Sequence, residues 1–391
     1  MKKILIIAGE TSSDMHAANL VRDIKSLDKN IGFFGLGGDR MQDAGVELLY
    51  NIVHMAFIGP GGLFKHYAKL KKIYNSLCEY INKNTPDCAI LIDFAEFNLR
   101  VAKNLKKLGV PVIYYISPQV WAWGAWRINT IKKFVDKMLV FFKFEEELYR
   151  SRGIDVTFVG HPLLDSVKPA RNKEDIIKEL RIDNGAAVVG VLPGSRENEV
   201  NNILPIMLDS CKLLLKKTAG LKIEFVLPLA PSIEERCIKE IIDRNSINIK
   251  IIKSSTYDAL AICDAAMVAS GTATLETALM GVPMAIIYRV NLLTYLMARN
   301  VIRLPYIGIV NVIAGRKIVE EFLQQEARPE CISDYILRLL EDRKLSNSIK
   351  EKFVDIRKLL GESGASKRAA KEVVSFLCGL SKPLQLRAGL I

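Results

Sequence analysis

The sequence has few of the residues that would place the chain among secreted or metal-binding proteins. Its seven cysteines form no Cys-x-x-Cys pair, and an odd, scattered set in a chain of this size argues against a disulfide framework and favours the reducing cytosol. Its four histidines lack zinc-ligand spacing, and no two aspartates are separated by a single residue. We therefore predict no metal, and we predict no cofactor.

Long uninterrupted apolar segments are also missing. Only five apolar residues lie between the first lysines and the first glycine, too few for an export signal. The longest uncharged run, 108–126, has 19 residues, but two glycines and two prolines interrupt it. We therefore expect a strand and a loop there, and no membrane span.

Positive charge, in contrast, is plentiful. Of the 391 residues, 55 are Lys or Arg and 43 are Asp or Glu, which gives a formal net charge of +12. Residues 343–391 hold eleven Lys or Arg against four acids, and four lysines crowd residues 65–72. Such charge suits nucleic acid, an anionic membrane or a phosphorylated substrate, and solvated helix faces are the simpler interpretation of each cluster. Because no nucleic-acid-binding motif is present, we expect no nucleic acid partner.

Hydrophobic patterning predicts two α/β domains. Half of the residues are hydrophobic, and short apolar runs alternate with amphipathic helical stretches, which is typical of a doubly wound parallel sheet. After a polar stretch at 168–185 the series restarts, so we expect a second Rossmann-like unit to follow the first. The expected strands are 4–8, 31–36, 89–92, 110–116, 138–142 and 156–159 in the first domain and 187–192, 223–227, 249–252, 265–269 and 284–288 in the second.

Polar residues gather directly after several of the expected strands. Ligands of such sheets bind outside the carboxyl ends of the strands, so these loops are the candidate site. Two nucleotide-type domains facing one another across a cleft would bring the loops together. The loops are 9–14, 93–98, 193–196 and 270–276.

Residues 270–274, Ser-Gly-Thr-Ala-Thr, follow an apolar strand and begin a helical pattern. The backbone N–H groups of Gly271, Thr272 and Ala273 and the positive helix end suit a phosphate. Glu276, about one turn later, is placed to accept hydrogen bonds from ribose hydroxyls, as acidic residues do near other nucleotide phosphate sites. A plain helix cap of small residues is the alternative.

A second strand-to-helix turn ends in Ser195 and Arg196. A guanidinium there can clamp a diphosphate through two parallel hydrogen bonds. An exposed arginine paired with Glu197 or Glu199 is the alternative. Neither turn has the Gly-x-x-x-x-Gly-Lys-Ser/Thr form, which disfavours ATP-driven phosphoryl transfer.

Asp93 ends the apolar run 89–92, at the point where an α/β sheet presents catalytic side chains. As a general base it would take a proton from an attacking hydroxyl, an effect worth about 10²–10⁴ in rate. Burial would have to raise its pKa from about 4 for efficient action near neutrality. Glu10 and Asp14 are competing carboxylates, and a helix-capping role is the alternative, more strongly so for Asp14.

Aromatic residues indicate surfaces that could meet a sugar or an acyl chain. Trp121, Trp123 and Trp126 lie in one loop and can line such a pocket, with core packing as the alternative. Residues 58–77 combine lysines with apolar positions at helical spacing, the pattern of an interfacial helix, for which a buried core helix is the alternative. The apolar positions are Leu63, Phe64, Tyr67 and Leu70.

Strings of these residues, in this order, resemble the lipid-A-disaccharide synthase family, bacterial glycosyltransferases of the GT-B class. The resemblance covers nearly the whole chain. The matching strings are Ala8-Gly9-Glu10, Ser117-Pro-Gln-Val-Trp-Ala-Trp123, Gly160-His-Pro162, Leu192-Pro-Gly-Ser-Arg196, Ser270-Gly-Thr-Ala273 with Glu276, Gly281-Val-Pro-Met284, Asn311, and Ala314-Gly-Arg316.

The resemblance implies a GT-B fold, two Rossmann-like doubly wound parallel-sheet domains facing across a cleft. It implies inverting, metal-independent condensation of UDP-2,3-diacylglucosamine with 2,3-diacylglucosamine 1-phosphate (lipid X), which yields the β-1,6 lipid A disaccharide 1-phosphate and UDP. It also implies a cytoplasmic protein, peripheral on the anionic cytoplasmic face of the inner membrane, and it is compatible with a homodimer. On this analogy, residues 1–168 form the acceptor and membrane-side domain, 169–350 bind the UDP-sugar, and the basic helical segment 351–391 packs back on the first domain.

Site residues carry over from the family by position. Asp93 resembles the family's catalytic acid, with Glu10 as the second candidate. The donor side comprises Arg196, Ser195, Gly271, Thr272, Ala273, Glu276, Asn311 and Arg316, and the acceptor or acyl side Ser12, Asp14, Asn98, Trp121, Trp123, Phe64 and Leu70. The sequence departs from the family pattern chiefly on the acceptor side, at Ser13, Ala17, Gly59-Pro60 and residues 94–96.

Two other kinds of protein stay open as alternatives. A UDP-sugar 2-epimerase on a similar scaffold would need no acyl acceptor, and incubation with UDP-sugar alone distinguishes it. A non-catalytic nucleotide-binding membrane adaptor would bind UDP without moving any sugar.

Overall fold

The structure is a computed structural model that describes residues 2–53, 63–122, 124–218, 220–253, 255–290 and 305–380, with the backbone alone at 63–67. The chain divides into two compact units, each described by itself. The first comprises Met1–Pro162 with Leu360–Ile391, and the second comprises Leu163–Leu359.

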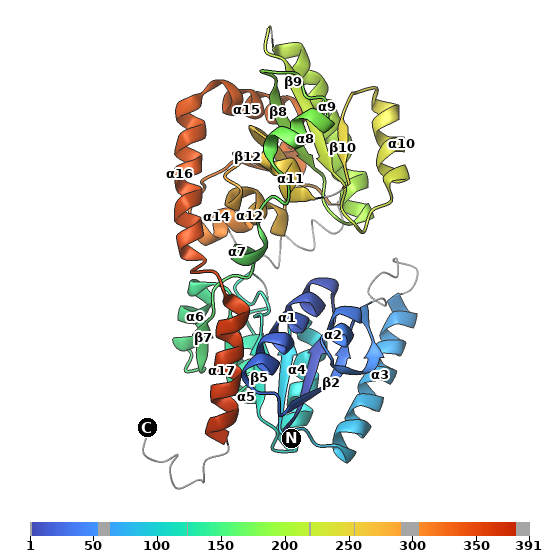
Figure 1. The fold of residues 1–391 in the computed structure, drawn as a ribbon, viewed down its shortest axis with the longest axis vertical. Helices are drawn as coiled ribbons and strands as arrows, with labels where there is room; N and C mark the ends of the chain where they lie inside the picture. The colour runs from blue at the N-terminus through green and yellow to red at the C-terminus, as the bar shows by residue number, and fades with distance from the viewer. Residues whose placement is uncertain are drawn as a thin grey trace. The chain divides into compact units, whose positions relative to one another are not determined.

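The first unit contains a seven-stranded parallel sheet in the order β3-β2-β1-β4-β5-β6-β7. Figure 1 labels β2, β5 and β7 of this sheet. Its central strands are continuously apolar because helices cover both faces: Ile4 and Ile6 of β1 belong to one core, and Leu5 and Ile7 to the other. The strands are β1 (Lys2–Ala8), β2 (Ile31–Gly37), β3 (Glu47–Asn51), β4 (Cys88–Ile92), β5 (Val112–Tyr115), β6 (Lys137–Val140) and β7 (Val156–Phe158).

Helices of the first unit form two layers. On one face, α1 (Thr11–Leu27) packs against α17 (Ala365–Leu380), which returns to this unit from the far end of the chain. Val373 and Leu377 of α17 are buried there, and each contributes about 1.5–3 kcal/mol by leaving water. The remaining helices are α2 (Asp39–Asp43), α3 (Leu63–Lys83), α4 (Ala95–Lys107), α5 (Arg127–Phe134) and α6 (Lys143–Arg150).

The second unit contains a six-stranded parallel sheet in the order β10-β9-β8-β11-β12-β13. Its strands are β8 (Ala187–Leu192), β9 (Ile223–Pro228), β10 (Lys250–Ile252), β11 (Ala265–Ala269), β12 (Met284–Tyr288) and β13 (Glu321–Leu323). Its helices are α7 (Leu163–Ser166), α8 (Lys173–Glu179), α9 (Glu197–Lys217), α10 (Glu235–Asn245), α11 (Thr256–Ala261), α12 (Thr272–Leu279), α14 (Ile309–Ala314), the 3₁₀ turn η3 (Gln324–Glu326), α15 (Pro329–Glu341) and α16 (Arg343–Leu359).

Each sheet has one point at which the strand order reverses. The chain winds outward from β1 to β3 and then restarts on the other side of β1 with β4, and β8 and β11 stand in the same relation. Ligands of doubly wound sheets bind beyond the carboxyl ends of the two strands at such a switch point. The four polar loops singled out in the sequence follow these four strands, β1, β4, β8 and β11.

The parallel α/β architecture confirms the fold class predicted from the sequence, with two strands missed and the division shifted. β3 and β13 were not expected because both are edge strands without a run of buried residues. The units divide at Pro162 and Leu359 instead of 168 and 350, so α16, with residues 351–359, belongs to the second unit. Within the described ranges, none of the helices combines the length and apolar character that a bilayer crossing requires.

Candidate functional site

In the first unit, the loops after β1 and β4 touch one another. A methyl group at Gly9 would lie 2.5 Å from the ring of Phe94, so only glycine permits this approach. Glu10 follows as the N-cap of α1 with an exposed side chain, and Asp93 precedes Phe94. The structure therefore brings the two catalytic candidates to the same switch point.

The backbone at Asp93 and Phe94 forms a left-handed turn, with φ of 48° and 47°. Non-glycine residues rarely adopt this conformation, which costs on the order of 1–3 kcal/mol per residue. Two buried donors stabilise it: Tyr114 Oη and Asn98 Nδ2 lie 2.5 Å and 2.8 Å from the carbonyl oxygen of Asp93. The turn joins β4 to α4 within two residues and leaves the Asp93 side chain half-buried.

The carboxyl group of Asp93 is more basic than that of an ordinary aspartate. Burial, and then the negative charge of Glu10, raise its pKa to about 6, against a hydrogen bond from the Phe94 N–H that lowers it. At neutral pH the group is mostly ionised and still a useful proton acceptor. The pKa shift that a general base at this position requires is therefore present.

Asp14 and Asn98, which the sequence assigned to the acceptor side, are buried side chains that hydrogen-bond to the backbone. Asp14 is buried, and its carboxylate accepts three backbone N–H bonds of 2.8–3.2 Å at the start of α2 rather than capping its own helix. Asn98 is fully buried, and its amide donates to the carbonyls of Ile92 and Asp93. Neither side chain offers surface to a ligand, whereas Ser12 is exposed in the first turn of α1.

The tryptophan loop follows β5 and is anchored by one indole. Trp121 donates from Nε1 to Glu145 at 3.0 Å and packs edge-on against Phe144. Glu145 is buried on α6, and this burial raises its pKa to about 7. Trp126 is exposed at the other end of the loop, and Trp123 lies outside the described residues.

An ion pair that the sequence did not reveal joins α5 to the first turn of α4, directly after the Asp93 turn. Arg127, almost fully buried at the start of α5, pairs with Glu96 in the first turn of α4. Its guanidinium also lies 5.0 Å from the ring centre of Trp126. The two partners are 31 residues apart, so no local spacing could have indicated the pair.

The expected interfacial segment, residues 58–77, is described only in part. Residues 58–62 and the side chain of Phe64 lie outside the described residues, and Leu70 is half-buried on α3. The face of α3 that packs in the core carries Ile73 and Leu77. A membrane contact here therefore stays a prediction.

In the second unit, Glu199 holds the turn after β8. Its carboxylate accepts hydrogen bonds from the Ser195 N–H at 3.2 Å and from Arg196 Nη1 at 2.7 Å, and Gly194 makes room for it at φ 109°. Arg196 is 77% exposed. A surface ion pair of this kind contributes about 0–1 kcal/mol, so the guanidinium can exchange its partner for an anion at little cost.

The loop after β11 leaves the N-terminus of α12 open. Apart from Gly271 itself and its two chain neighbours, no described residue has an atom within 4 Å of the position that a Cβ on Gly271 would take. Gly271 and Thr272 are exposed and Ala273 is half-buried, while the Thr274 N–H and hydroxyl both bond to the Gly271 carbonyl. The first N–H groups of this eight-residue helix can therefore meet an anion.

Glu276 lies one turn further along α12. Its Oε1 accepts a 2.8 Å hydrogen bond from the hydroxyl of Tyr257 on α11. Burial raises the pKa of Glu276, and the Tyr257 hydrogen bond partly offsets this. The sequence singled out Glu276 and missed Tyr257.

Asn311, expected to contact the donor, has a structural role in the fold. It is fully buried on α14, where Nδ2 donates to the Val319 carbonyl at 2.9 Å and to Glu321 at 2.7 Å. Its Oδ1 accepts from the N–H groups of Ile318 and Val319. Both its donors and its acceptor are thus occupied, whereas Arg316 is exposed just beyond the helix.

Two Rossmann-like units of this kind define the GT-B class of fold. The chain superposes over 97% of its length on 98% of a putative UDP-N-acetylglucosamine 2-epimerase from Listeria monocytogenes, with a TM-score of 0.63 and 12% identity. It superposes over 98% of its length on 100% of the calicheamicin glycosyltransferase, with a TM-score of 0.62 and 14% identity. At these identities the likeness establishes the fold alone.

Sequence comparison narrows the class to one family. The profile described as lipid-A-disaccharide synthetase matches residues 4–375. The lipid-A-disaccharide synthase of Geobacter metallireducens is 41% identical over 376 residues, 96% of this chain and 97% of that protein, and the enzyme of Coxiella burnetii is 40% identical over 96% and 99%. The chain belongs to the lipid-A-disaccharide synthase family and is a hexosyltransferase of lipid A biosynthesis.

Proposed function

We propose that the protein transfers 2,3-diacylglucosamine from UDP to the 6-hydroxyl of 2,3-diacylglucosamine 1-phosphate, with inversion and without a metal. The products are the β-1,6-linked disaccharide 1-phosphate and UDP. The observation that carries the proposal is the half-buried carboxyl group of Asp93, whose pKa is raised to about 6 at the switch point of the first unit. Family membership supports the disaccharide product.

The bond changes follow from a single displacement. Oxygen O6 of the acceptor attacks the anomeric carbon of the donor from the face opposite to UDP. The new C–O bond forms as the bond to the β-phosphate oxygen breaks, and UDP leaves with that electron pair. The Asp93 carboxylate takes the hydroxyl proton, which is worth about 10²–10⁴ in rate. One displacement inverts the anomeric centre.

Negative charge on the leaving UDP needs stabilisation at the switch point of the second unit. The open N-terminus of α12 and the exposed guanidinium of Arg196 supply positive charge there. Glu276 would accept hydrogen bonds from the ribose. In a chain without an Asp-x-Asp pair, Arg196 and the helix end take the part that Mg²⁺ plays in metal-dependent relatives of this chemistry.

The acceptor's acyl chains bring the first unit to a membrane in this proposal. Residues 58–77 and the tryptophan loop form the contact, and the net charge of +12 favours an anionic cytoplasmic leaflet of the inner membrane. A variant with Phe64→Ser and Leu70→Ser should lose binding to anionic liposomes, while Leu27→Ser, at an exposed leucine of the same unit, should retain it. A homodimer is a family-based expectation.

The deciding experiment supplies UDP-2,3-diacylglucosamine and lipid X to the purified protein with and without EDTA. We expect the same initial rate in both, UDP as coproduct, and a β anomeric linkage by NMR of the disaccharide. Epimerised UDP-sugar formed without acceptor would instead favour the epimerase. A rate abolished by EDTA and restored by Mg²⁺ would contradict the metal-independent mechanism.

A further inference from the structure

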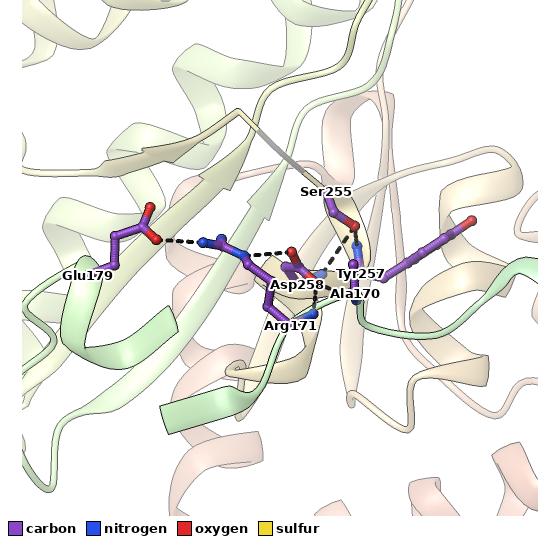
Figure 2. Close-up of polar contacts among 6 residues, drawn as sticks. All are labelled: Ala170, Arg171, Glu179, Ser255, Tyr257 and Asp258. Atoms are coloured by element: carbon purple, nitrogen blue, oxygen red, sulfur yellow. Dashed lines mark hydrogen bonds and ion pairs between the residues drawn. The ribbon is translucent and has the colours of Figure 1, made fainter. Parts of the chain in front are cut away.

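The short helix α11 is held from outside by a polar network (Figure 2). A six-residue helix is marginal by itself. Ser255 caps it by accepting the N–H groups of Tyr257 and Asp258 at 3.2 Å and 3.4 Å. These contacts fix the first turn, which carries both side chains.

Asp258 ties this turn to the segment that precedes α8. Its buried carboxylate accepts the N–H groups of Ala170 and Arg171 at 2.7 Å and 3.2 Å, and Nε of Arg171 at 3.0 Å. The Arg171 guanidinium continues to Glu179 at 2.5 Å, so it lies between two carboxylates, as Figure 2 shows. Every contact of this network fixes the place of α11 within the second unit.

Tyr257 uses that fixed position to reach α12. Its hydroxyl donates to Oε1 of Glu276 at 2.8 Å. Burial, with the charge of Glu276, raises the pKa of the Tyr257 phenol, so it stays a donor across the physiological range. Among the described residues no other side chain hydrogen-bonds to Glu276.

We propose that Tyr257 is a positioning residue for the nucleotide: it holds one oxygen of Glu276 so that the other accepts hydrogen bonds from the ribose hydroxyls of UDP. This inference rests on the proposed function, in which the second unit binds UDP. A carboxylate already fixed in one rotamer loses less conformational freedom when the ribose arrives, which favours binding. This gain in binding free energy depends on the ribose hydroxyls and does not involve the diphosphate.

The experiment measures Kd by calorimetry on the full chain for UDP and for 2′,3′-dideoxy-UDP, which lacks both ribose hydroxyls. Tyr257→Phe removes one oxygen atom. We expect it to weaken UDP binding roughly 2- to 10-fold, the range of a single net hydrogen bond, and to leave dideoxy-UDP binding unchanged. Tyr335→Phe is the matched control, because Tyr335 is a buried tyrosine of the same unit that packs on Phe322, and both of its Kd values should equal those of the wild type.

Glu276→Gln provides a second route to the same answer. We expect this variant to lose selectivity for UDP over dideoxy-UDP, and adding Tyr257→Phe to it should cause no further loss, because Tyr257 acts through Glu276. Thermal unfolding of each variant shows whether the fold is retained.

Three results overturn the inference. If Tyr257→Phe binds UDP like the wild type, or weakens UDP and dideoxy-UDP equally, Tyr257 does not position Glu276 and the proposed function stands. If the wild-type protein does not bind UDP at all, the proposed function fails and this inference fails with it.

Discussion

Asn98 Nδ2 lies 2.8 Å from the backbone carbonyl oxygen of Asp93, and this hydrogen bond runs from the first turn of α4 back to the residue that follows β4. Both carbonyls flanking the end of the strand, those of Ile92 and Asp93, accept from the same amide. The side chain therefore supports a left-handed turn that would otherwise cost on the order of 1–3 kcal/mol per residue. The candidate base takes its position from a fully buried residue.

Replacing Asn98 with alanine should lower both stability and turnover. The Ile92 carbonyl would lose the amide donor and the Asp93 carbonyl would keep only its bond from Tyr114, and losing buried hydrogen bonds of this kind costs roughly 1–3 kcal/mol. We expect a fall in kcat of about tenfold or more, with KM for the donor nearly unchanged. Urea unfolding and steady-state kinetics measure the two effects. Asn104→Ala is the control on the same helix, because the amide nitrogen of Asn104 has no partner among the described residues. Equal losses in both variants would contradict the supporting role of Asn98.

Replacing Asp93 with asparagine should remove the base and preserve the shape. We expect the transfer rate to fall by roughly 10²–10⁴, with the Kd for UDP within twofold of the wild type because the proposed nucleotide site lies in the other unit. Asp136→Asn, at the amino end of β6 in the same sheet, should retain activity. If Asp93→Asn retains turnover, Asp93 is not the general base, and Glu10 becomes the candidate.

Glu10→Gln should shift the pH dependence of kcat/KM. In the wild type the base must be ionised, so the rate rises with pH through the pKa of Asp93, about 6. Removing the negative charge of Glu10 lowers that pKa, and the rising limb moves to lower pH. The shift is partial because burial is the larger cause. If the rising limb of the pH profile does not move in Glu10→Gln, the charge of Glu10 does not affect the pKa of Asp93. If the variant loses all activity, Glu10 is the base.

Arg196→Ala should weaken use of the donor. Charge-assisted hydrogen bonds to a diphosphate are worth about 1.5–3 kcal/mol, so we expect KM for the UDP-sugar to rise roughly 10- to 100-fold. Arg196→Lys should restore only part of the lost donor binding, because an ammonium group cannot form two parallel hydrogen bonds to the diphosphate. Arg236→Ala, an exposed arginine paired with Glu240 in the same unit, serves as the control. An unchanged KM in Arg196→Ala would exclude the clamp.

Glu145→Gln should alter the pH dependence of stability. Burial raises the pKa of Glu145 from 4.5 to about 7, so between these values the folded protein binds more protons than the unfolded chain. The wild type therefore loses stability at this site as pH rises through that window. Glutamine can still accept from Trp121, so the variant should have the higher melting temperature at pH 8 and lose this advantage by pH 4.5. Glu147→Gln, on the exposed face of α6, should follow the wild type; identical curves for all three proteins would contradict the prediction.

The parallel sheets could be predicted because strands covered on both faces leave continuous apolar runs in the sequence. The loops of the candidate site were chosen by the rule that ligands bind at the carboxyl ends of such strands. β3 and β13 could not be predicted in this way, because an edge strand with exposed or half-buried side chains has no apolar run. The second boundary between the units could not be placed to the residue, since α16 and α17 have similar amphipathic patterns and pack in different units.

Partners of the site residues were beyond the sequence for a different reason. Tyr257 is 19 residues from Glu276, and Tyr114 is 21 residues from Asp93. Such pairs form only in the folded sheet, so the local spacing of residues in the sequence cannot predict them. The same holds for Asn311, whose motif position suggested a ligand contact while its hydrogen bonds hold the chain at Ile318 and Val319.

Helix α17 is synthesised long after the rest of the first unit, to which it belongs. The face of α1 that it covers is finished early, but Ala369 and Val373 emerge only after the whole of Leu163–Leu359 has been synthesised. At about 5–20 residues per second, that interval lasts on the order of 10–40 seconds. During this interval, the apolar face of α1 that α17 will cover stays exposed to chaperones and to neighbouring nascent chains. The hydrogen bond from Lys2 Nζ to the carbonyl of Leu377, at 2.9 Å, can form only after this interval, because it joins β1 to α17.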